Sequence, residues 1–136
     1  MVKITGARRH SRRLQALSGP AALQEVGRAV YAASDMARVE AQLLISEGAV
    51  SGKGHVASAP GEPPNWDTGL LAGGITNRKT GPASALTEST APYAAHLELG
   101  TSKMAARPYM EPAAKIVRPR LTLLCTTAIN ITIRRG

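Results

Sequence analysis

Apolar side chains recur every three or four residues in a first long stretch of the chain. Ser18-Gly19-Pro20 precedes this stretch and Gly48 follows it, which are typical signals for a helix start and stop. Since each helical residue adds about 1.5 Å, the pattern predicts an amphipathic helix over 20–47 about 40 Å long. Its apolar positions are Leu23, Val26, Val30, Ala33, Ala37, Ala41 and Leu44.

A second helical pattern begins near the C-terminal third of the chain. Pro119 lies inside it and predicts a kink or break, because proline lacks the backbone N–H that a helix interior uses. The segment from Leu121 to Ile133 is rich in Thr and Ile, so it fits either a helix or a strand. The apolar positions of the pattern are Met110, Ala113, Val117, Leu121, Leu124 and Ala128.

Shorter signals lie between and before these patterns. Leu70 to Arg78 and Ala83 to Thr90 are compatible with strands, and the Gly81-Pro82 turn between them predicts a β-hairpin. A short helix is expected over 93–99, ending at Gly100. Near the start, 2–5 reads as a short edge strand and 7–17 as one or two helical turns.

The predicted elements define an α+β fold. A long N-terminal helix packs on a small antiparallel sheet with a β-hairpin, and a second C-terminal helix or helix-strand segment follows. The length of 136 residues fits one domain over 1–136. Two parts are expected to lie outside the packed body: a basic N-terminal arm, 1–13, and a long flexible loop, 51–67, rich in Gly, Pro and Ser.

The composition limits the core that this domain can build. The chain has no Phe, one Trp and three Tyr, and much of its 43% hydrophobic fraction is Ala, which buries little area. A chain with so few large apolar side chains gains stability by packing against neighbours. We therefore expect self-association.

Positive charge is concentrated near the N-terminus. The net charge is +8, and 1–13 contains five basic residues and no acid. Such a segment attracts DNA or an acidic partner protein, and the sequence does not distinguish the two. No aromatic residue lies among these basic residues, so any DNA contact would be through phosphates and sensitive to salt. The basic residues are Lys3, Arg8, Arg9, Arg12 and Arg13.

Candidate chemistry is sparse. The histidines lie more than 40 residues apart, without a second ligand at helical spacing, and the single Cys125 precludes a disulfide within the chain. The segment 48–54 lacks the spacing and the Ser or Thr of a phosphate-binding loop. We expect no enzyme activity, no cofactor and no metal site. No stretch approaches the roughly 18 apolar residues of a membrane span, so no membrane partner is expected.

One segment carries a family resemblance. Residues 92–113 read PYAAHLELGTSKMAARPYMEPA, with a Tyr-Ala pair, a Glu two residues before Gly-Thr, a loop, an aromatic residue after Pro, and a final Pro-Ala. This segment resembles the tail-completion, or head-to-tail joining, proteins of lambdoid and related long-tailed phages, the gene-product-ten-like family. The match extends to Pro64–Leu71, and the family more often has Phe where this chain has Tyr109. The motif residues are Thr68, Gly69, Leu70, Tyr93, Glu98, Gly100, Thr101, Pro108, Tyr109 and Pro112.

The resemblance implies a structural subunit of a ring, expected to be a hexamer, at the phage neck or the top of the tail. Such a ring completes the tail and joins it to the DNA-filled head, as a tail terminator or tail-completion protein. Its partners would be other copies of itself and adjacent connector, tail-tube or terminator proteins, with genomic DNA passing nearby. The location implied is the virion neck, reached after assembly in the host cytoplasm. A head-closure or stopper ring of the connector is the alternative, followed by a free basic DNA-binding protein.

Overall fold

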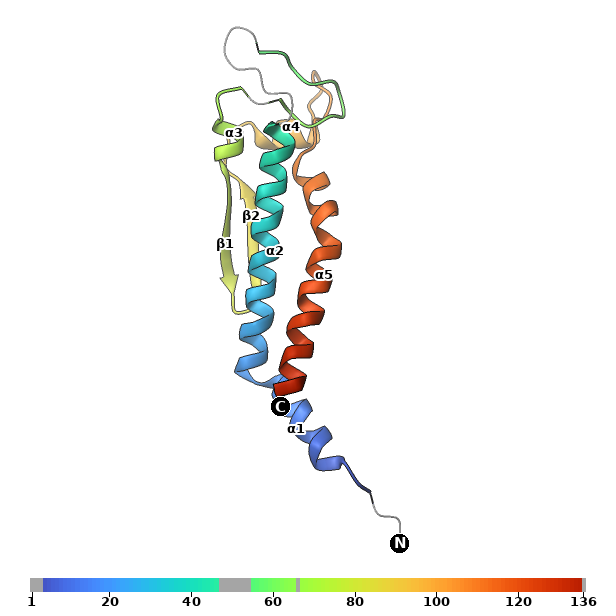
Figure 1. The fold of residues 1–136 in the computed structure, drawn as a ribbon. Helices are drawn as coiled ribbons and strands as arrows, with labels where there is room; N and C mark the ends of the chain where they lie inside the picture. Colours follow the sequence, from blue (N-terminus) through green and yellow to red (C-terminus); the bar gives the residue numbers. More distant parts are fainter. Residues whose placement is uncertain (1–3, 47–54, 66, 136) are drawn as a thin grey trace.

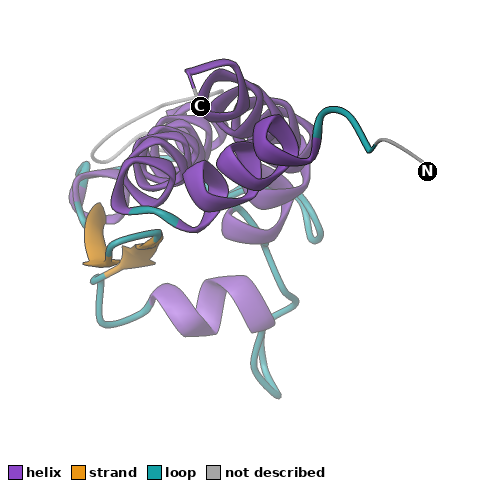
Figure 2. Ribbon diagram, turned by 90° about the horizontal axis from the view of Figure 1, so that it is seen from below, coloured by secondary structure: helices purple, strands orange, loops and turns teal. Residues whose placement is uncertain are grey.

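The structure is a computed structural model that describes residues 4–46, 55–65 and 67–135. Two long antiparallel helices, α2 (Pro20–Ser46) and α5 (Met110–Arg135), form its body (Figure 1). An antiparallel hairpin of β1 (Ile75–Gly81) and β2 (Ser84–Ser89) packs on α2. Seen along the long helices, the hairpin lies to one side of them (Figure 2). The α+β fold predicted from the sequence is confirmed.

The short elements gather at the two ends of the body. Helices α3 (Leu70–Gly73) and α4 (Ala94–Leu99) lie at the end where α5 begins, which we call the capped end. Helix α1 (Ala7–Ser18) lies at the opposite end and extends beyond α2 and α5 (Figure 1). We call this opposite end the basic end and define it as 4–30 together with 125–135.

Helix α2 confirms the first helical prediction, with Pro20 as its first residue and small side chains on its buried face. The small side chains of Ala22, Ala29, Ala33 and Ala41 let α5 approach α2 closely. Gly27 has a similar role toward the hairpin, since a Cβ there would overlap the Pro82 carbonyl of the β-turn. Ser34 fixes the hairpin further, because its carbonyl and hydroxyl oxygens lie 2.9 and 2.8 Å from the Thr87 hydroxyl.

Helix α5 is continuous, so of the kink or break expected at Pro119 the break does not occur. Proline removes one backbone hydrogen bond at a cost of about 3 kcal/mol. Packing on both sides of Pro119 offsets this cost, because Val117 and Ala128 are buried and Pro119 itself is exposed. The segment 121–133 is helix, not strand. Its threonine hydroxyls donate to carbonyls four residues earlier, as Thr126 does to Thr122 at 2.8 Å, so they are satisfied within the helix.

The hairpin is confirmed, but its first strand begins later than Leu70. Leu70–Gly73 forms a helical turn because Gly69, with φ +82°, turns the chain and Leu71 and Ala72 are buried in the core. The strands pair from Ile75 opposite Ser89 to Gly81 opposite Ser84.

The N-terminal prediction needs two corrections. Ile4 and Thr5 are not in a strand, and Val2 and Lys3 lie outside the described residues. The two strands pair only with each other in the part of the chain that is described, so no edge is occupied by 4–5. The one or two helical turns expected over 7–17 are a full helix of 12 residues, α1. Within the predicted loop, 55–65 and 67 have no regular structure, while 51–54 and 66 lie outside the described residues.

The main core lies toward the capped end. It joins α2, α3, β1, α4 and α5, and its only large side chains below 2% exposure, among the described residues, are Ile45 and Tyr109. Alanines fill most of the remaining space. The core residues are Ala41, Ile45, Leu71, Ala72, Ile75, Ala94, Tyr109 and Ala113.

Candidate functional site

The predicted motif forms a junction that holds α4 against the start of α5. The carboxylate of Glu98, near the end of α4, accepts hydrogen bonds from three successive backbone N–H groups. These are Tyr109 at 2.9 Å, Met110 at 3.0 Å and Glu111 at 2.9 Å. Helix starts leave their first N–H groups without partners and favour negative charge. Glu98 therefore caps α5 from 11 to 13 positions earlier in the chain.

Tyr109 anchors this junction in the core. Its side chain is fully buried, and its hydroxyl donates a 2.8 Å hydrogen bond to the Ser89 hydroxyl at the end of β2. Burial raises the pKa of the Tyr109 hydroxyl, as does the negative charge of Glu98, while the bond to Ser89 lowers it; the net effect is a raised pKa. The hydroxyl that distinguishes Tyr109 from Phe thus connects α5 to the hairpin.

The loop between α4 and α5 is shaped by the Gly-Thr pair of the motif. Gly100 has φ +76°, and a Cβ there would lie 2.8 Å from the Ala106 nitrogen, so the position requires glycine. The Thr101 hydroxyl accepts the Met104 N–H at 3.1 Å and closes a tight turn. Arg107 N–H then donates to the Leu97 carbonyl at 2.6 Å, which returns the chain to α4.

The upstream part of the motif meets the downstream part at the capped end. Thr68, Gly69, Leu70 and Tyr93 line one open hollow of about 440 Å³. Leu70 is 67% exposed and Tyr93 39% exposed, so both present apolar surface at this end. Pro108 and Pro112 are half-buried and lie just before and just inside α5.

A smaller cavity of about 200 Å³ lies beside the junction. His55, Ser58, Asp67 and Arg107 are among its lining residues. The Ser58 hydroxyl and the Nε of Arg107 are buried without a hydrogen-bond partner among the described residues.

The basic residues predicted near the N-terminus are placed on α1. Arg8, Arg9, Arg12 and Arg13 are all exposed, whereas Lys3 lies outside the described residues. The structure brings Arg28, Arg134 and Arg135 to the same end, where Glu25 pairs with Arg28 at 3.4 Å and Arg135 at 3.3 Å. Sequence analysis missed these three, because only the antiparallel packing of α2 and α5 places them beside α1.

Ser89 was also missed by the sequence analysis. It carries no motif signal, and it gains its role from the hairpin register, which places it where the buried Tyr109 hydroxyl reaches it.

In the described part of the chain, no group of three His, Cys, Asp or Glu side chains is arranged to hold a metal ion. None of the helices in this part of the chain combines the length and the apolar character needed to cross a membrane.

Comparison of the chain with protein-family models, with curated proteins and with solved structures finds no match.

Proposed function

We propose that this protein is a structural, non-enzymatic subunit of a ring at the neck or tail top of a long-tailed phage. In this role it completes the tail and joins it to the DNA-filled head. Copies of the chain contact one another around the ring, and adjacent connector, tail-tube or terminator proteins contact its two faces. Six copies are expected from the family resemblance of 92–113.

The observation that carries self-association, the structural part of the proposal, is the balance of buried and exposed apolar side chains. Among the described residues, 13 hydrophobic residues are buried and eight of them are alanine, leaving five large ones. Fifteen large hydrophobic residues are exposed. Single exposed apolar residues are ordinary, but such an excess over the buried set is typical of a chain that completes its packing with partners.

Helix α5 provides one apolar surface for such packing. Ile116 and Leu123 are 43% and 67% exposed and lie seven residues apart, so they project from the same side of the helix. Val39 and Leu43 of α2, four residues apart, are 40% and 54% exposed and add further apolar surface for contacts between copies.

The junction at the capped end supports a structural role for the motif. Glu98, Gly100, Thr101 and Tyr109 each fix a backbone turn or a helix start through the contacts that they make among the described residues. Leu70, Tyr93 and Leu99 are exposed at the same end, where a neighbouring ring would dock.

The placement at a phage neck rests on the resemblance of 92–113 and 64–71 alone. A head-closure ring of the connector would use the same subunit surfaces and is the alternative placement. The two differ in what the loss of the gene leaves behind. If the ring completes the tail, loss of the gene should leave filled heads and separate tails, whereas loss of a head-closure ring should leave heads that lose their DNA.

Deletion of the gene from a phage that carries it tests the proposal. Electron microscopy of the lysate is expected to show unjoined heads and tails and no infectious particles. Supplying the wild-type protein or the Thr122→Glu/Thr126→Glu variant, which adds two charges at exposed polar positions of α5, is expected to restore joining. The Ile116→Glu/Leu123→Glu variant is expected to fail. Joined, infectious particles without the gene would contradict the proposal.

A further inference from the structure

The basic end carries more positive charge than its folding requires. Its described residues include seven arginines and one acid, Glu25, a net of +6. The rest of the described chain has eight basic and seven acidic residues, a net of +1. Nearly all of the excess charge therefore lies at one end. The arginines are Arg8, Arg9, Arg12, Arg13, Arg28, Arg134 and Arg135.

Four of these arginines form a stripe along α1. Arg8 and Arg12, like Arg9 and Arg13, are four residues apart, so all four cover one side of the helix. None of the four has an ion-pair partner among the described residues. Unpaired like charges at this spacing destabilise a helix, which argues that the stripe is kept for a contact and not for stability.

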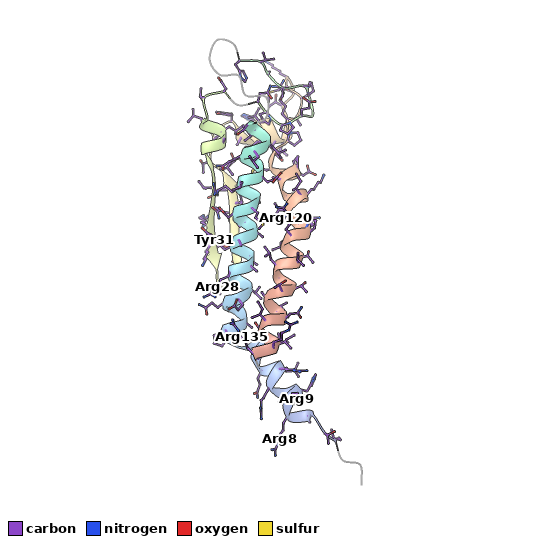
Figure 3. The ribbon with its side chains drawn as sticks, in the orientation of Figure 1. Arg8, Arg9, Arg28, Tyr31, Arg120 and Arg135 are labelled. Atoms are coloured by element: carbon purple, nitrogen blue, oxygen red, sulfur yellow. The ribbon has the colours of Figure 1, made fainter. Side chains whose placement is uncertain are left out.

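Helix α1 contacts the body through its C-terminal part. Leu17 lines a hollow of about 330 Å³ with Leu23 and Val26 of α2 and Ile129 of α5, and α1 contacts both of these helices. The four arginines precede Leu17 by four to nine residues, toward the end of α1 that extends beyond the body (Figure 1), and all four are exposed. Arg8 and Arg9 project at the far end of the molecule from the capped end (Figure 3).

The stripe has the charge density of duplex DNA. At about 1.5 Å per residue, Arg8 to Arg13 extends over about 7.5 Å of the helix axis. Duplex DNA presents one phosphate per about 1.7 Å of its axis, or about four phosphates over that length. The two charges per unit length are therefore similar, which makes the stripe and duplex DNA complementary. The N-terminus of α1 adds its positive dipole end to the same surface.

We propose that the basic end is a contact surface for the phosphates of duplex DNA, with the arginine stripe of α1 as its centre and Arg134 beside it. All seven basic side chains there are arginine, whose planar fork binds phosphate oxygens in pairs. Helix α1 has no Trp, Phe or Tyr, which disfavours both base stacking and insertion into a membrane surface. The contact reads no base sequence.

This DNA contact goes beyond ring formation and does not rest on it. Each chain carries the whole stripe, so the contact exists in a single copy. A ring would add several stripes around one DNA axis and raise the overall affinity.

Binding of the full chain to a fluorescein-labelled 30-base-pair duplex, followed by anisotropy at several NaCl concentrations, tests the proposal. For four to six phosphate contacts, affinity is expected to fall about 150-fold to about 2,000-fold between 50 and 200 mM NaCl. The Arg8→Gln/Arg9→Gln/Arg12→Gln/Arg13→Gln variant is expected to lower the slope of log affinity against log salt by about 3.6. Duplexes of different sequence are expected to bind equally.

A matched variant separates the stripe from net charge. The Lys103→Gln/Lys115→Gln/Arg118→Gln/Arg120→Gln variant also removes four positive charges, but from exposed positions away from the basic end. Arg120, for example, lies well above α1 in Figure 3. This variant is expected to retain the wild-type slope. Equal losses in the two variants would overturn the proposal.

Two further probes cover the other anionic partners. Polyglutamate and vesicles of phosphatidylserine and phosphatidylcholine are tested at 100 mM NaCl against the wild type and the stripe variant. DNA would be overturned as the partner if either probe bound the wild type as tightly as the duplex does and bound the stripe variant less. Sedimentation velocity in the same buffer reports the oligomeric state. Monomers that bind DNA through α1 would therefore contradict the ring and leave the DNA contact supported.

Discussion

The two ends of this molecule are built in opposite ways. At the capped end, polar groups bond within the fold: the Glu98 carboxylate accepts three backbone N–H groups, and the hydroxyl of the buried Tyr109 donates to the hairpin. At the basic end, α1 has no buried residue and directs four arginines outward. The first arrangement stabilises the fold, and the second leaves charge available for a partner. Substitutions at the two ends should consequently change different measured quantities.

The largest loss of stability is expected from Tyr109→Ala. Removing a fully buried aromatic side chain lowers the free energy of unfolding by about 3 to 5 kcal/mol. Urea unfolding followed by circular dichroism, at one fixed protein concentration, measures the change. Tyr93→Ala, at the half-exposed tyrosine of the same end, is the control and is expected to cost far less. Similar losses in both variants would mean that Tyr109 is not the anchor.

The capping carboxylate is expected to have the next largest effect. Glu98→Ala leaves three helix-start N–H groups without their acceptor and lowers the free energy of unfolding by about 2 kcal/mol. Glu98→Gln keeps one acceptor oxygen and is expected to recover part of this loss. Glu111→Ala is the control: its carboxylate lies in the same first turn of α5 but pairs with Lys115 and accepts no backbone N–H of the described residues. An equal loss in Glu111→Ala would show that only the charge near the helix start matters.

A smaller effect is expected at alkaline pH. The folded-state pKa of Tyr109 is raised, so its hydroxyl releases a proton more readily in the unfolded chain. Its contribution is therefore complete below the ordinary tyrosine pKa of about 10 and is lost as the pH rises through the folded-state value. Urea midpoints of the wild type should fall above pH 10 more steeply than those of Tyr109→Phe. Parallel curves for the two proteins would contradict this linkage.

The smallest effect on stability is expected at the basic end. Replacing the four arginines of α1 with Gln changes the free energy of unfolding by less than about 0.5 kcal/mol, because the side chains are exposed and Gln is a good helix former. Thermal unfolding measures this. A large loss would show that the stripe supports the fold, which would erase the contrast between the ends.

Much of the fold follows from local patterns in the sequence. The spacing of apolar residues predicts both long helices, and Gly81-Pro82 predicts the hairpin. The break expected as one alternative at Pro119 and the strand start at Leu70 were wrong, because tertiary packing overrides local preference. Pro119 is tolerated since flanking residues of α5 pack on α2, and Leu70 enters a helical turn since its neighbours are buried.

The candidate sites were less accessible to sequence analysis. The motif residues were found, but the capping role of Glu98 depends on α4 and α5 meeting across a loop, which no spacing rule contains. The arginines of α1 were found as a charge run. Arg134 and Arg135 join them only because α5 runs antiparallel to α2 and ends beside α1.

Self-association is the claim on which the account of function depends. Sedimentation velocity of the purified chain over a hundredfold range of concentration measures it directly. The account predicts a closed oligomer of one mass, expected at six copies, that the Ile116→Glu/Leu123→Glu variant reduces to smaller species and Thr122→Glu/Thr126→Glu does not. A wild-type chain that sediments as a monomer at every concentration would contradict it.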